Sequence, residues 1–229
     1  MSCGRRVLVL APHADDETLG VGGTLARHVA DGDEVHVAVV TGHGDDPHPL
    51  WPRETWDKIR DEARRAMQVL GISHLHFREV PAALVADQPT HRLNKVVGEL
   101  VAAIQPEILY VPFLYDLHKD HREIFHAASV AWRTSGEVGR GIKAVYCYEV
   151  QSETHWNAPY LEAGFLPNVW VDISAHLETK MRALRCYESQ LRPAPDSRSV
   201  EAVRALAVWR GSQQNLAAAE AFVLIRMLR

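Results

Sequence analysis

The sequence predicts an α/β protein built around a mostly parallel β-sheet. Short apolar runs alternate with segments of helical periodicity, with successive strands roughly 30 residues apart, which is the pattern of βαβ units. The first run, Val7 to Ala11, is apolar throughout, as expected for a buried strand. The 229 residues are 47% hydrophobic and 24% charged, which is typical of a globular protein with a sizeable core.

The first part of the chain is expected to form four strands, each followed by a helix. Asp31-Gly32 and Gly71 are helix-stop signals, and Pro106 breaks the third helical segment. Residues 42–52 and 78–89 are expected to be loops. The expected strands are 5–11, 34–41, 73–77 and 107–113, and the expected helices are 18–30, 53–70, 90–104 and 122–133.

The last 90 or so residues are less regular, as judged from their hydrophobic pattern. Residues 143–150 and 168–173 have the composition of strands, with antiparallel pairing as an option. A helix is expected over 174–190 with Ser174 as its N-cap, and another over 197–210 after Pro193 and Pro195. Residues 221–227 fit either a strand or a helix. Because no linker separates this part, we expect a single domain over 1–229.

Composition excludes several classes of protein. The formal net charge of −4 argues against a general nucleic-acid binder. No stretch approaches the ~20 apolar residues of a membrane span, and the run after Arg5 and Arg6 is shorter than the ~7–15 residues of a signal-peptide core. Cys3, Cys147 and Cys186 lie too far apart for a cysteine metal motif or a disulfide framework. We therefore expect a cytoplasmic protein.

Two short polar clusters follow two of the expected strands. Residues 13–17 read His-Ala-Asp-Asp-Glu after the first strand, and residues 118–121 read His-Lys-Asp-His after the fourth. The carboxyl ends of parallel strands lie at one edge of a sheet, so these clusters are expected to face each other. Burying unpaired carboxylates is costly, and a cation is therefore expected between them.

We hypothesise that the cation is a metal and that the metal is zinc. Two imidazoles and one carboxylate form a three-ligand site that leaves one position open for water. Of the adjacent Asp15 and Asp16, one would bind the metal and the other would act as general base on the water. Similarly, His118 and His121 would divide into a ligand and a free imidazole. A simpler interpretation, in which the aspartates only cap the following helix, explains neither histidine.

Other polar residues have supporting roles in this hypothesis. Asp120 or Asp116 would orient the free imidazole from behind the ligands. His43 and His48, after the second strand, are further candidates for the rim of the site. The other histidines are expected to be surface or core residues: His28, His36, His74, His76, His91, His126, His155 and His176.

The glycines at 20, 22 and 23 invite a dinucleotide-binding interpretation, which fails. Leu25 stands where the third glycine of G-x-G-x-x-G is required, and the acidic turn before the glycines would repel a pyrophosphate. We expect these glycines to serve close packing of the first helix against the sheet.

These motifs resemble those of a known family. Residues 12–17 resemble the P/A-H-P-D-D-E signature of the PIG-L/LmbE-like deacetylases, and residues 118–121 resemble their H-x-D-H motif. Ala14 and Lys119 occupy spacer positions where proline is frequent. Ile59 stands where the family often has an arginine that contacts substrate, and Arg60 is next to it. Further similarity covers the segments 62–71, 148–156, 172–180, 189–190 and 219–222.

The resemblance implies an LmbE-like fold, that is, a Rossmann-like three-layer sandwich, and zinc-dependent removal of the acetyl group from an N-acetylglucosamine-type amino sugar or sugar conjugate. It implies that His13, Asp16 and His121 are the metal ligands and Asp15 the general base. It also implies that His118 stabilises the oxyanion or protonates the leaving amine.

Two alternatives use the same residues. The same metal and Asp15 could hydrate an unsaturated carboxylic acid, for which Arg53 and Arg60 are the nearby basic residues. The second alternative is a relative that binds a sugar or a partner without catalysing a reaction, or a hydrolase that acts on another amide. The expected partner is a small amino-sugar substrate, and assembly into a homo-oligomer is left open.

Overall fold

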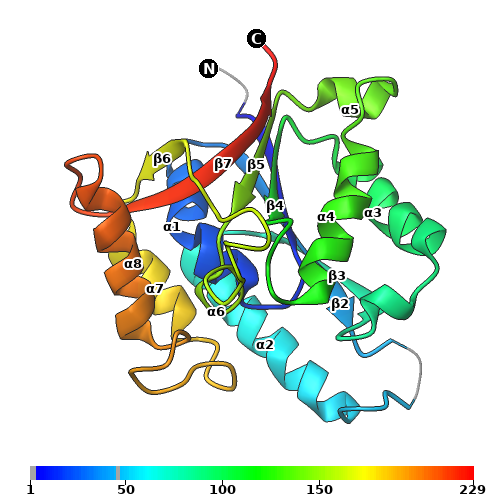
Figure 1. Ribbon diagram of the computed structural model, residues 1–229, viewed down its shortest axis with the longest axis horizontal. Helices are drawn as coiled ribbons and strands as arrows, with labels where there is room; N and C mark the ends of the chain where they lie inside the picture. Colours follow the sequence, from blue (N-terminus) through cyan, green and yellow to red (C-terminus); the bar gives the residue numbers. More distant parts are fainter. Residues whose placement is uncertain (1–3, 45–46) are drawn as a thin grey trace.

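The structure is a computed structural model that describes residues 4–44 and 47–229. Within these ranges the strands and helices alternate along most of the chain (Figure 1). The strands are β1 (Arg6–Ala11), β2 (Glu34–Gly42), β3 (His74–Pro81), β4 (Ile108–Pro112), β5 (Ala144–Tyr148), β6 (Val169–Asp172) and β7 (Ala219–Met227). The helices are α1 (Asp16–Ala30), α2 (Arg53–Leu70), η1 (Val85–Asp87, a 3-10 turn), α3 (Thr90–Ile104), α4 (Lys119–Ala131), α5 (Glu137–Gly141), α6 (Gln151–Thr154), α7 (Leu177–Leu184) and α8 (Val200–Ser212).

One sheet contains all seven strands in the order β3-β2-β1-β4-β5-β7-β6. The pairs from β3 through to β5 are parallel, and β7 is antiparallel to both of its neighbours. The prediction of a mostly parallel sheet is therefore confirmed. The strand order reverses between β1 and β4, which is where ligands bind in open sheets of this kind.

Helices cover both faces of the sheet, which confirms the three-layer sandwich (Figure 1). One core joins alternate residues of β1, such as Val7, to buried side chains of α1, α2 and α7, including Met67 and Met181. The second core joins Leu8 and the other alternate residues of β1 to α3 and α4. Each β1 side chain thus packs into one of two cores, as the pleat of a strand requires.

The sequence-based boundaries differ from the structure mainly in the C-terminal part. The helix expected over 174–190 is only α7, eight residues long. Ser174 is not its N-cap, because the Ser174 hydroxyl donates to Asp172 Oδ1 (2.6 Å) in the turn after β6. Ser199, in contrast, caps α8 by accepting a hydrogen bond from Ala202 N (3.1 Å). Residues 78–81, expected in a loop, extend β3, and 221–227 belong to a strand rather than a helix.

The same sheet runs through both halves of the chain, and we keep the single domain over 1–229 as a proposal on that ground. Among the described residues, no helix combines the length and apolar character needed to span a membrane.

Two glycines of α1 explain the Gly-rich segment. A Cβ on Gly20 would lie 2.4 Å from the Tyr148 ring of β5, and one on Gly23 would lie 2.6 Å from Ile173 Cδ1. Both distances are too short for real contacts, so a side chain at either position would push α1 off its neighbours. The prediction of close helix–sheet packing is confirmed at Gly20.

A buried ion pair joins α1, α7 and β7. Lys180 Nζ donates to Glu220 Oε1 (2.6 Å) and to Leu19 O (2.7 Å), and both charged side chains are only 4% exposed. Glu220 also accepts the amides of Gly23 (2.9 Å) and Thr24 (2.7 Å). The carboxylate therefore holds the middle of α1 against the last strand.

Replacing Lys180 with methionine is expected to lower the free energy of unfolding by about 3–5 kcal/mol, because the Glu220 carboxylate stays buried without its cation. Urea unfolding measures this loss. Arg204→Met is the matched control, since Arg204 pairs with Glu178 at the same 2.6 Å on the exposed surface and should change little. Equal effects of the two substitutions would contradict this account of the Lys180 pair.

Candidate metal centre

The two polar clusters meet at the point where the strand order reverses. His13 follows β1 and Asp16 begins α1, while His118 precedes α4 and His121 lies in its first turn. His13 is therefore close to both histidines of α4, with ring centroids 4.5 Å from His118 and 5.4 Å from His121. Residues that are more than a hundred positions apart thus share one site, as the sequence predicted.

Three of these side chains converge on one point. Asp16 Oδ2 lies 3.2 Å from His13 Nδ1 and 3.2 Å from His121 Nε2. One ligand atom from each of the three residues lies within 4.8 Å of the others. Zinc bonds of 2.0–2.1 Å in a tetrahedron hold neighbouring ligand atoms about 3.3 Å apart, so the spacing fits such an ion.

Two buried atoms at this point, Asp16 Oδ1 and His121 Nε2, have no hydrogen-bond partner within residues 4–44 and 47–229. Both residues are fully buried. Because buried polar atoms without a partner are costly and rare, they indicate a missing partner. A metal ion is a partner of the right charge and size for a carboxylate oxygen and an imidazole nitrogen.

A carboxylate stands behind each of the two imidazoles. Asp116 Oδ2 lies 2.8 Å from His121 Nδ1 and is held by the Thr154 hydroxyl through Oδ1 (2.6 Å). Asp120 Oδ2 lies 3.0 Å from His13 Nε2 and accepts the Ala83 amide (2.6 Å). Such carboxylates fix the ring tautomer so that the opposite nitrogen is free to bind a metal.

This arrangement corrects the sequence-based expectation for Asp120. Neither the Asp120 nor the Asp116 carboxylate bonds His118, since the Asp120 carboxylate bonds His13 and the Asp116 carboxylate bonds His121. The backbone amide of Asp120 donates to His118 Nδ1 instead (3.2 Å). Asp120 Oδ2 is 4.0 Å from His118 Nδ1.

A second set of donors, made by His13, His118 and Asp120, also lies close together. It fits a metal less well, because both Asp120 oxygens accept backbone amides, from Ala83 (2.6 Å) and Val85 (3.4 Å). Asp16 Oδ2 accepts the His13 amide (2.8 Å), but Asp16 Oδ1 has no partner among the described residues. His118 Nδ1 in turn accepts the Asp120 amide (3.2 Å). The set with His121 is therefore the better candidate.

The electrostatics of the site call for a positive centre. Burial alone would lower the pKa of His13, but hydrogen bonds with Asp120 and Asp16 raise it to about 9. Burial likewise opposes the charge on His121, yet Asp16 and Asp116 raise its pKa well above the usual value. Burial opposes the charge on Asp16 as well, but the two imidazoles hold its pKa well below normal. The carboxylates of Asp16, Asp116 and Asp120 thus favour protonated imidazoles at His13 and His121 when no metal cation balances their charge.

Asp15 has a strained backbone held in place by its neighbours. Its φ of 136° lies in a region that residues other than glycine rarely adopt. The Glu17 carboxylate accepts the Asp15 amide (3.1 Å), and the Asp15 carbonyl accepts the Leu19 amide (2.8 Å). Glu17 is fixed in turn by the Tyr187 hydroxyl. This turn aims the Asp15 side chain into the site instead of along α1.

The Asp15 carboxylate is 2% exposed and only partly paired. Oδ1 has no hydrogen-bond partner in the part of the chain that the structure describes, while Oδ2 lies 3.4 Å from Arg198 Nη1. Burial raises the pKa of Asp15 to about 7, against the opposing charge of Arg198. Arg198 comes from the loop before α8, and no motif in the sequence indicated it.

His118 differs from the other two histidines in its charge. Burial and the neighbouring His13 lower the pKa of His118 to about 4, so the ring is neutral near pH 7. Its Nδ1 accepts the Asp120 amide, which leaves the proton on Nε2. A neutral imidazole with a fixed Nε2–H donor therefore borders the site.

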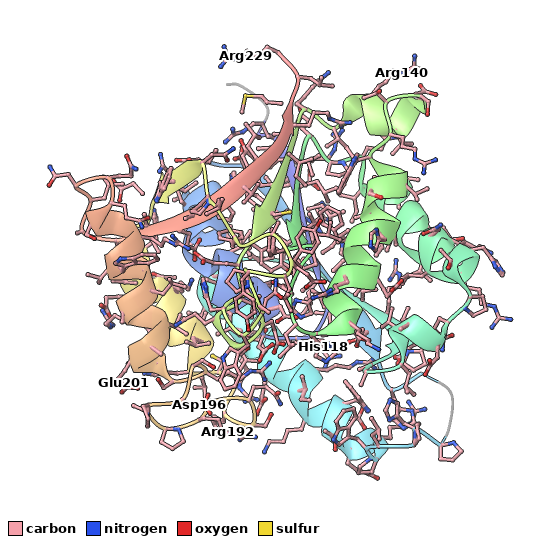
Figure 2. The ribbon with its side chains drawn as sticks, in the orientation of Figure 1. His118, Arg140, Arg192, Asp196, Glu201 and Arg229 are labelled. Atoms are coloured by element: carbon pink, nitrogen blue, oxygen red, sulfur yellow. The ribbon has the colours of Figure 1, made fainter. Side chains whose placement is uncertain are left out.

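A pocket of about 550 Å³ opens beside these residues, within the range of small-molecule sites. Figure 2 shows His118 at the start of α4, on the same side of the molecule as the loop that carries Arg192 and Asp196. The pocket is lined by His13, Ala14, Asp15, Trp51, Thr55, Trp56, Lys58, Ile59, Ala82, Ala83, His118, Ser189, Gln190, Arg192 and Arg198.

Some residues singled out from the sequence do not line this pocket. Arg60 pairs with Glu79 and lies over the Phe77 ring, while Ile59 takes the pocket position. His48 packs against the rings of Trp51 and Trp56 and so supports the wall from behind. Trp56, on α2, was missed because helical periodicity alone does not mark a pocket wall.

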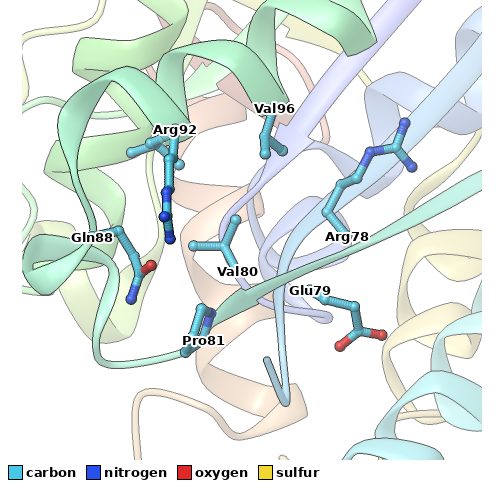
Figure 3. Close-up of a pocket in the computed structure, with 8 residues that line it drawn as sticks. Arg78, Glu79, Val80, Pro81, Gln88, Arg92 and Val96 are labelled. Atoms are coloured by element: carbon cyan, nitrogen blue, oxygen red, sulfur yellow. The ribbon is translucent and has the colours of Figure 1, made fainter. Parts of the chain in front are cut away.

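A smaller hollow of about 260 Å³ lies between the end of β3 and the start of α3 (Figure 3). Gln88 and Arg92 stand over Val80 and Pro81 there. Its lining residues include one carboxylate, Glu79, and no histidine, so it offers no comparable centre.

Comparisons with known proteins agree with this site. The PIG-L: GlcNAc-PI de-N-acetylase family matches residues 8–132, which contain both motifs. The diacetylchitobiose deacetylase of Thermococcus kodakarensis is 26% identical over 199 residues, covering 81% of this chain and 70% of that protein. The 1D-myo-inositol 2-acetamido-2-deoxy-alpha-D-glucopyranoside deacetylase of Rhodococcus jostii is 26% identical, covering 97% and 92%.

Among solved structures, the 4-carboxy-2-hydroxymuconate hydratase GalB of Pseudomonas putida has a TM-score of 0.76, covering 98% of each chain at 21% identity. That likeness concerns the fold alone. The family match spans more than half of the 229 residues, and so this chain belongs to the PIG-L family of de-N-acetylases.

Proposed function

We propose that this chain is a zinc-dependent N-deacetylase that removes the acetyl group from an N-acetylglucosamine-type amino sugar or sugar conjugate. The observation that carries the proposal is the set of unsatisfied buried atoms, Asp16 Oδ1, His121 Nε2 and Asp15 Oδ1, beside one pocket. The names of the two deacetylase relatives support an N-acetylated glucosamine unit as substrate.

In this proposal His13, Asp16 and His121 hold the metal. A zinc ion bound there would polarise the amide carbonyl and make a water molecule more acidic. The donor set of two imidazoles and one carboxylate suits zinc, and the partner-free atoms account for where the ion would be bound.

Asp15 acts as the general base on the attacking water. Its pKa of about 7 lets the carboxylate be ionised at neutral pH and still accept a proton readily. Oδ1, which has no partner within the described residues, is the atom that receives the proton. Glu17 and the turn around it keep this oxygen in position.

His118 serves as a hydrogen-bond donor in this mechanism. The sequence left two roles open, stabilising the oxyanion or protonating the leaving amine. Because the ring is neutral near pH 7 and carries its proton on Nε2, we favour donation to the developing oxyanion. Proton delivery to the amine then falls to Asp15, which has just received one from the water.

The pocket supports a sugar as the bound group. The Trp51 and Trp56 side chains line it, and the polar side chains of Thr55, Ser189 and Gln190 can reach hydroxyl groups. Trp51 belongs to the segment 42–52, Ala82 and Ala83 belong to 78–89, and four further lining residues lie between 189 and 198.

Removing Arg198 should shift the pH profile of this enzyme. The Arg198 cation lowers the pKa of Asp15, so Arg198→Gln leaves burial and the neighbouring carboxylates to raise that pKa further. A base must be ionised, and activity is lost as pH falls through its pKa. The acid limb of kcat/KM is therefore expected to move to higher pH.

The pH dependence of acetate release measures this shift. Arg192→Gln is the matched control, because Arg192 lines the same pocket but its guanidinium bonds the Leu191 carbonyl (3.5 Å) rather than Asp15. An unchanged acid limb in Arg198→Gln would contradict the assignment of Asp15 as the titrating base.

Hydration of an unsaturated carboxylic acid is a second candidate function. Lys58 and Arg192 line the pocket in addition to Arg198, and such basic side chains suit a carboxylate substrate. Arg53 and Arg60, suggested from the sequence, are not among the lining residues. Loss of enone absorbance without acetate release would favour this function.

The deacetylase proposal is tested by a screen of N-acetylated sugars and sugar conjugates. We expect metal-dependent release of acetate and primary amine in equal amounts from at least one glucosamine derivative. Release from none of them by the zinc-loaded protein would contradict the proposal.

A further inference from the structure

Three histidines and a glutamate gather on β2 and β3, far from the pocket. Glu34 and His36 are two residues apart on β2, and His74 and His76 are two apart on β3, with His36 beside His74 in the parallel register. Residues two apart on a strand share a face, so all four side chains project from one side of the sheet. They lie at the amino ends of both strands, whereas the catalytic pocket lies at the carboxyl ends.

The donor atoms of three of these residues are close enough to share an ion. Glu34 Oε1 lies 3.0 Å from His36 Nε2 and 3.9 Å from His74 Nε2. One ligand atom from each of Glu34, His36 and His74 lies within 4.8 Å of the others. Tetrahedral zinc needs about 3.3 Å between ligand atoms, so the exposed side chains of Glu34 and His74 would have to move closer to complete the site.

His76 fixes the ring of His36 from the other side. His36 Nδ1 lies 3.0 Å from His76 Nε2, and the two rings are parallel to within 9°. In the tautomer that donates from Nδ1 to His76, the lone pair of His36 Nε2 faces the Glu34 carboxylate at 3.0 Å, and the two acceptors repel each other unless a cation lies between them. In the other neutral tautomer, His36 Nδ1 accepts from His76 and Nε2 donates to Glu34.

A hydrogen on His36 Nε2 satisfies only the contact between His36 and Glu34. It leaves His74 Nε2 3.9 Å from Glu34 Oε1, which is too far for a hydrogen bond. A metal ion uses all three donors, and the His74 ring is already stacked on His36 with centroids 4.4 Å apart. We propose that Glu34, His36 and His74 form a second site for a divalent transition-metal ion, with His76 positioning the His36 ring.

The surroundings set the kind of ion and the strength of binding. Two imidazoles and a carboxylate select zinc, nickel or copper over magnesium, which prefers oxygen ligands. The side chains of Glu34 and His74 are 47% exposed, so the ion is reached from solvent and keeps open positions. Arg6 is paired with Glu34 in the sheet register, and Arg78 follows His76 on the same face.

The positive charges of Arg6 and Arg78 repel a metal cation, and they therefore weaken metal binding at this second site relative to the catalytic centre. In Figure 3 the Arg78 side chain points away from Pro81 and Gln88. Its charge also contributes to lowering the pKa of His76, after burial and His36. The second ion is therefore expected to bind less tightly than the first and to be removed first by a chelator.

Equilibrium dialysis of the full untagged chain against zinc tests this site. The wild type is expected to bind one more equivalent than His74→Gln, and both proteins should have the same circular dichroism spectrum. His91→Gln, at an exposed histidine of α3, is the matched control and should bind as the wild type does. Glu34→Gln is a second variant that should also lose the equivalent. Magnesium should not replace it.

The difference of one equivalent does not depend on the catalytic centre. If the proposed deacetylase site binds no metal, the wild type would bind one equivalent and His74→Gln none. Equal zinc binding by the wild type and His74→Gln would overturn the second site, whatever the activity. Unchanged acetate release in His74→Gln, with one equivalent lost, would establish the two sites as separate.

Discussion

Replacing Asp15 with asparagine is expected to lower kcat by about 10²–10⁴-fold with unchanged zinc content, the usual contribution of a general base. Asparagine has the same shape as aspartate and tolerates a positive φ better than most residues, so the strained turn at 136° should survive. The loss then reports on the carboxylate itself. Alanine at the same position would mix this effect with backbone strain.

Acetate release and metal analysis on the same preparation measure both quantities. Asp31→Asn, at the exposed end of α1, is the matched control and should retain full activity. A kcat of Asp15→Asn close to that of the wild type would show that another group is the base. Loss of zinc from Asp15→Asn would instead make Asp15 part of the metal centre.

Replacing His121 with alanine is expected to abolish both zinc binding and activity. The ring supplies a partner-free nitrogen to the centre and is held by Asp116, so no neighbouring side chain can take its place. Asp16→Asn should have the same effect and keeps the shape of the buried side chain, in case the cavity left by alanine impairs folding. Asp116→Asn should weaken metal affinity by about 10–100-fold, because it removes only the support behind His121.

His118→Ala separates the two histidines of the second motif. It is expected to keep its zinc but to lose about 10²–10³-fold in kcat, as for one oxyanion-stabilising donor. Metal analysis and kinetics of His118→Ala and His121→Ala, measured side by side, check the division of roles. Zinc lost from His118→Ala and kept in His121→Ala would reverse the assignment.

Much of the fold was predictable because its signals are local. A continuous apolar run such as Val7 to Ala11 predicts a strand at that place in the chain, and a helix-stop residue such as Gly71 predicts the end of a helix there. Parallel pairing then follows from the alternation of strands and helices, and it brings the clusters at 13–17 and 118–121 to one edge.

What could not be predicted depends on packing between distant segments. Arg198 contacts Asp15 only because the loop before α8 lies beside the N-terminal end of α1. Nothing in the local sequence around Arg198 indicates this contact. Asp120 bonds His13, and Asp116 bonds His121. These pairings likewise depend on ring positions within a few ångströms. The helix expected over 174–190 begins later, at Leu177, and Ser174 bonds within its own turn rather than to a helix amide.

The histidines of β2 and β3 show that a cluster is missed when each histidine is interpreted separately. Taken singly, His36 and His74 were assigned to the surface or the core. The spacing of two residues in Glu34-x-His36 and His74-x-His76, on two expected strands, was the available signal that the side chains share a face. Only the register between the strands places them side by side.

The central claim is tested most directly by measuring acetate release from three preparations of the same chain. The first is loaded with zinc, the second is stripped with a chelator, and the third is stripped and then reloaded with zinc. With an N-acetylglucosamine conjugate identified in the screen, we predict release by the first, none by the second and restored release by the third. Asp16→Asn should remain inactive after reloading. Equal release by the stripped and loaded wild type would contradict a metal-dependent deacetylase at His13, Asp16 and His121.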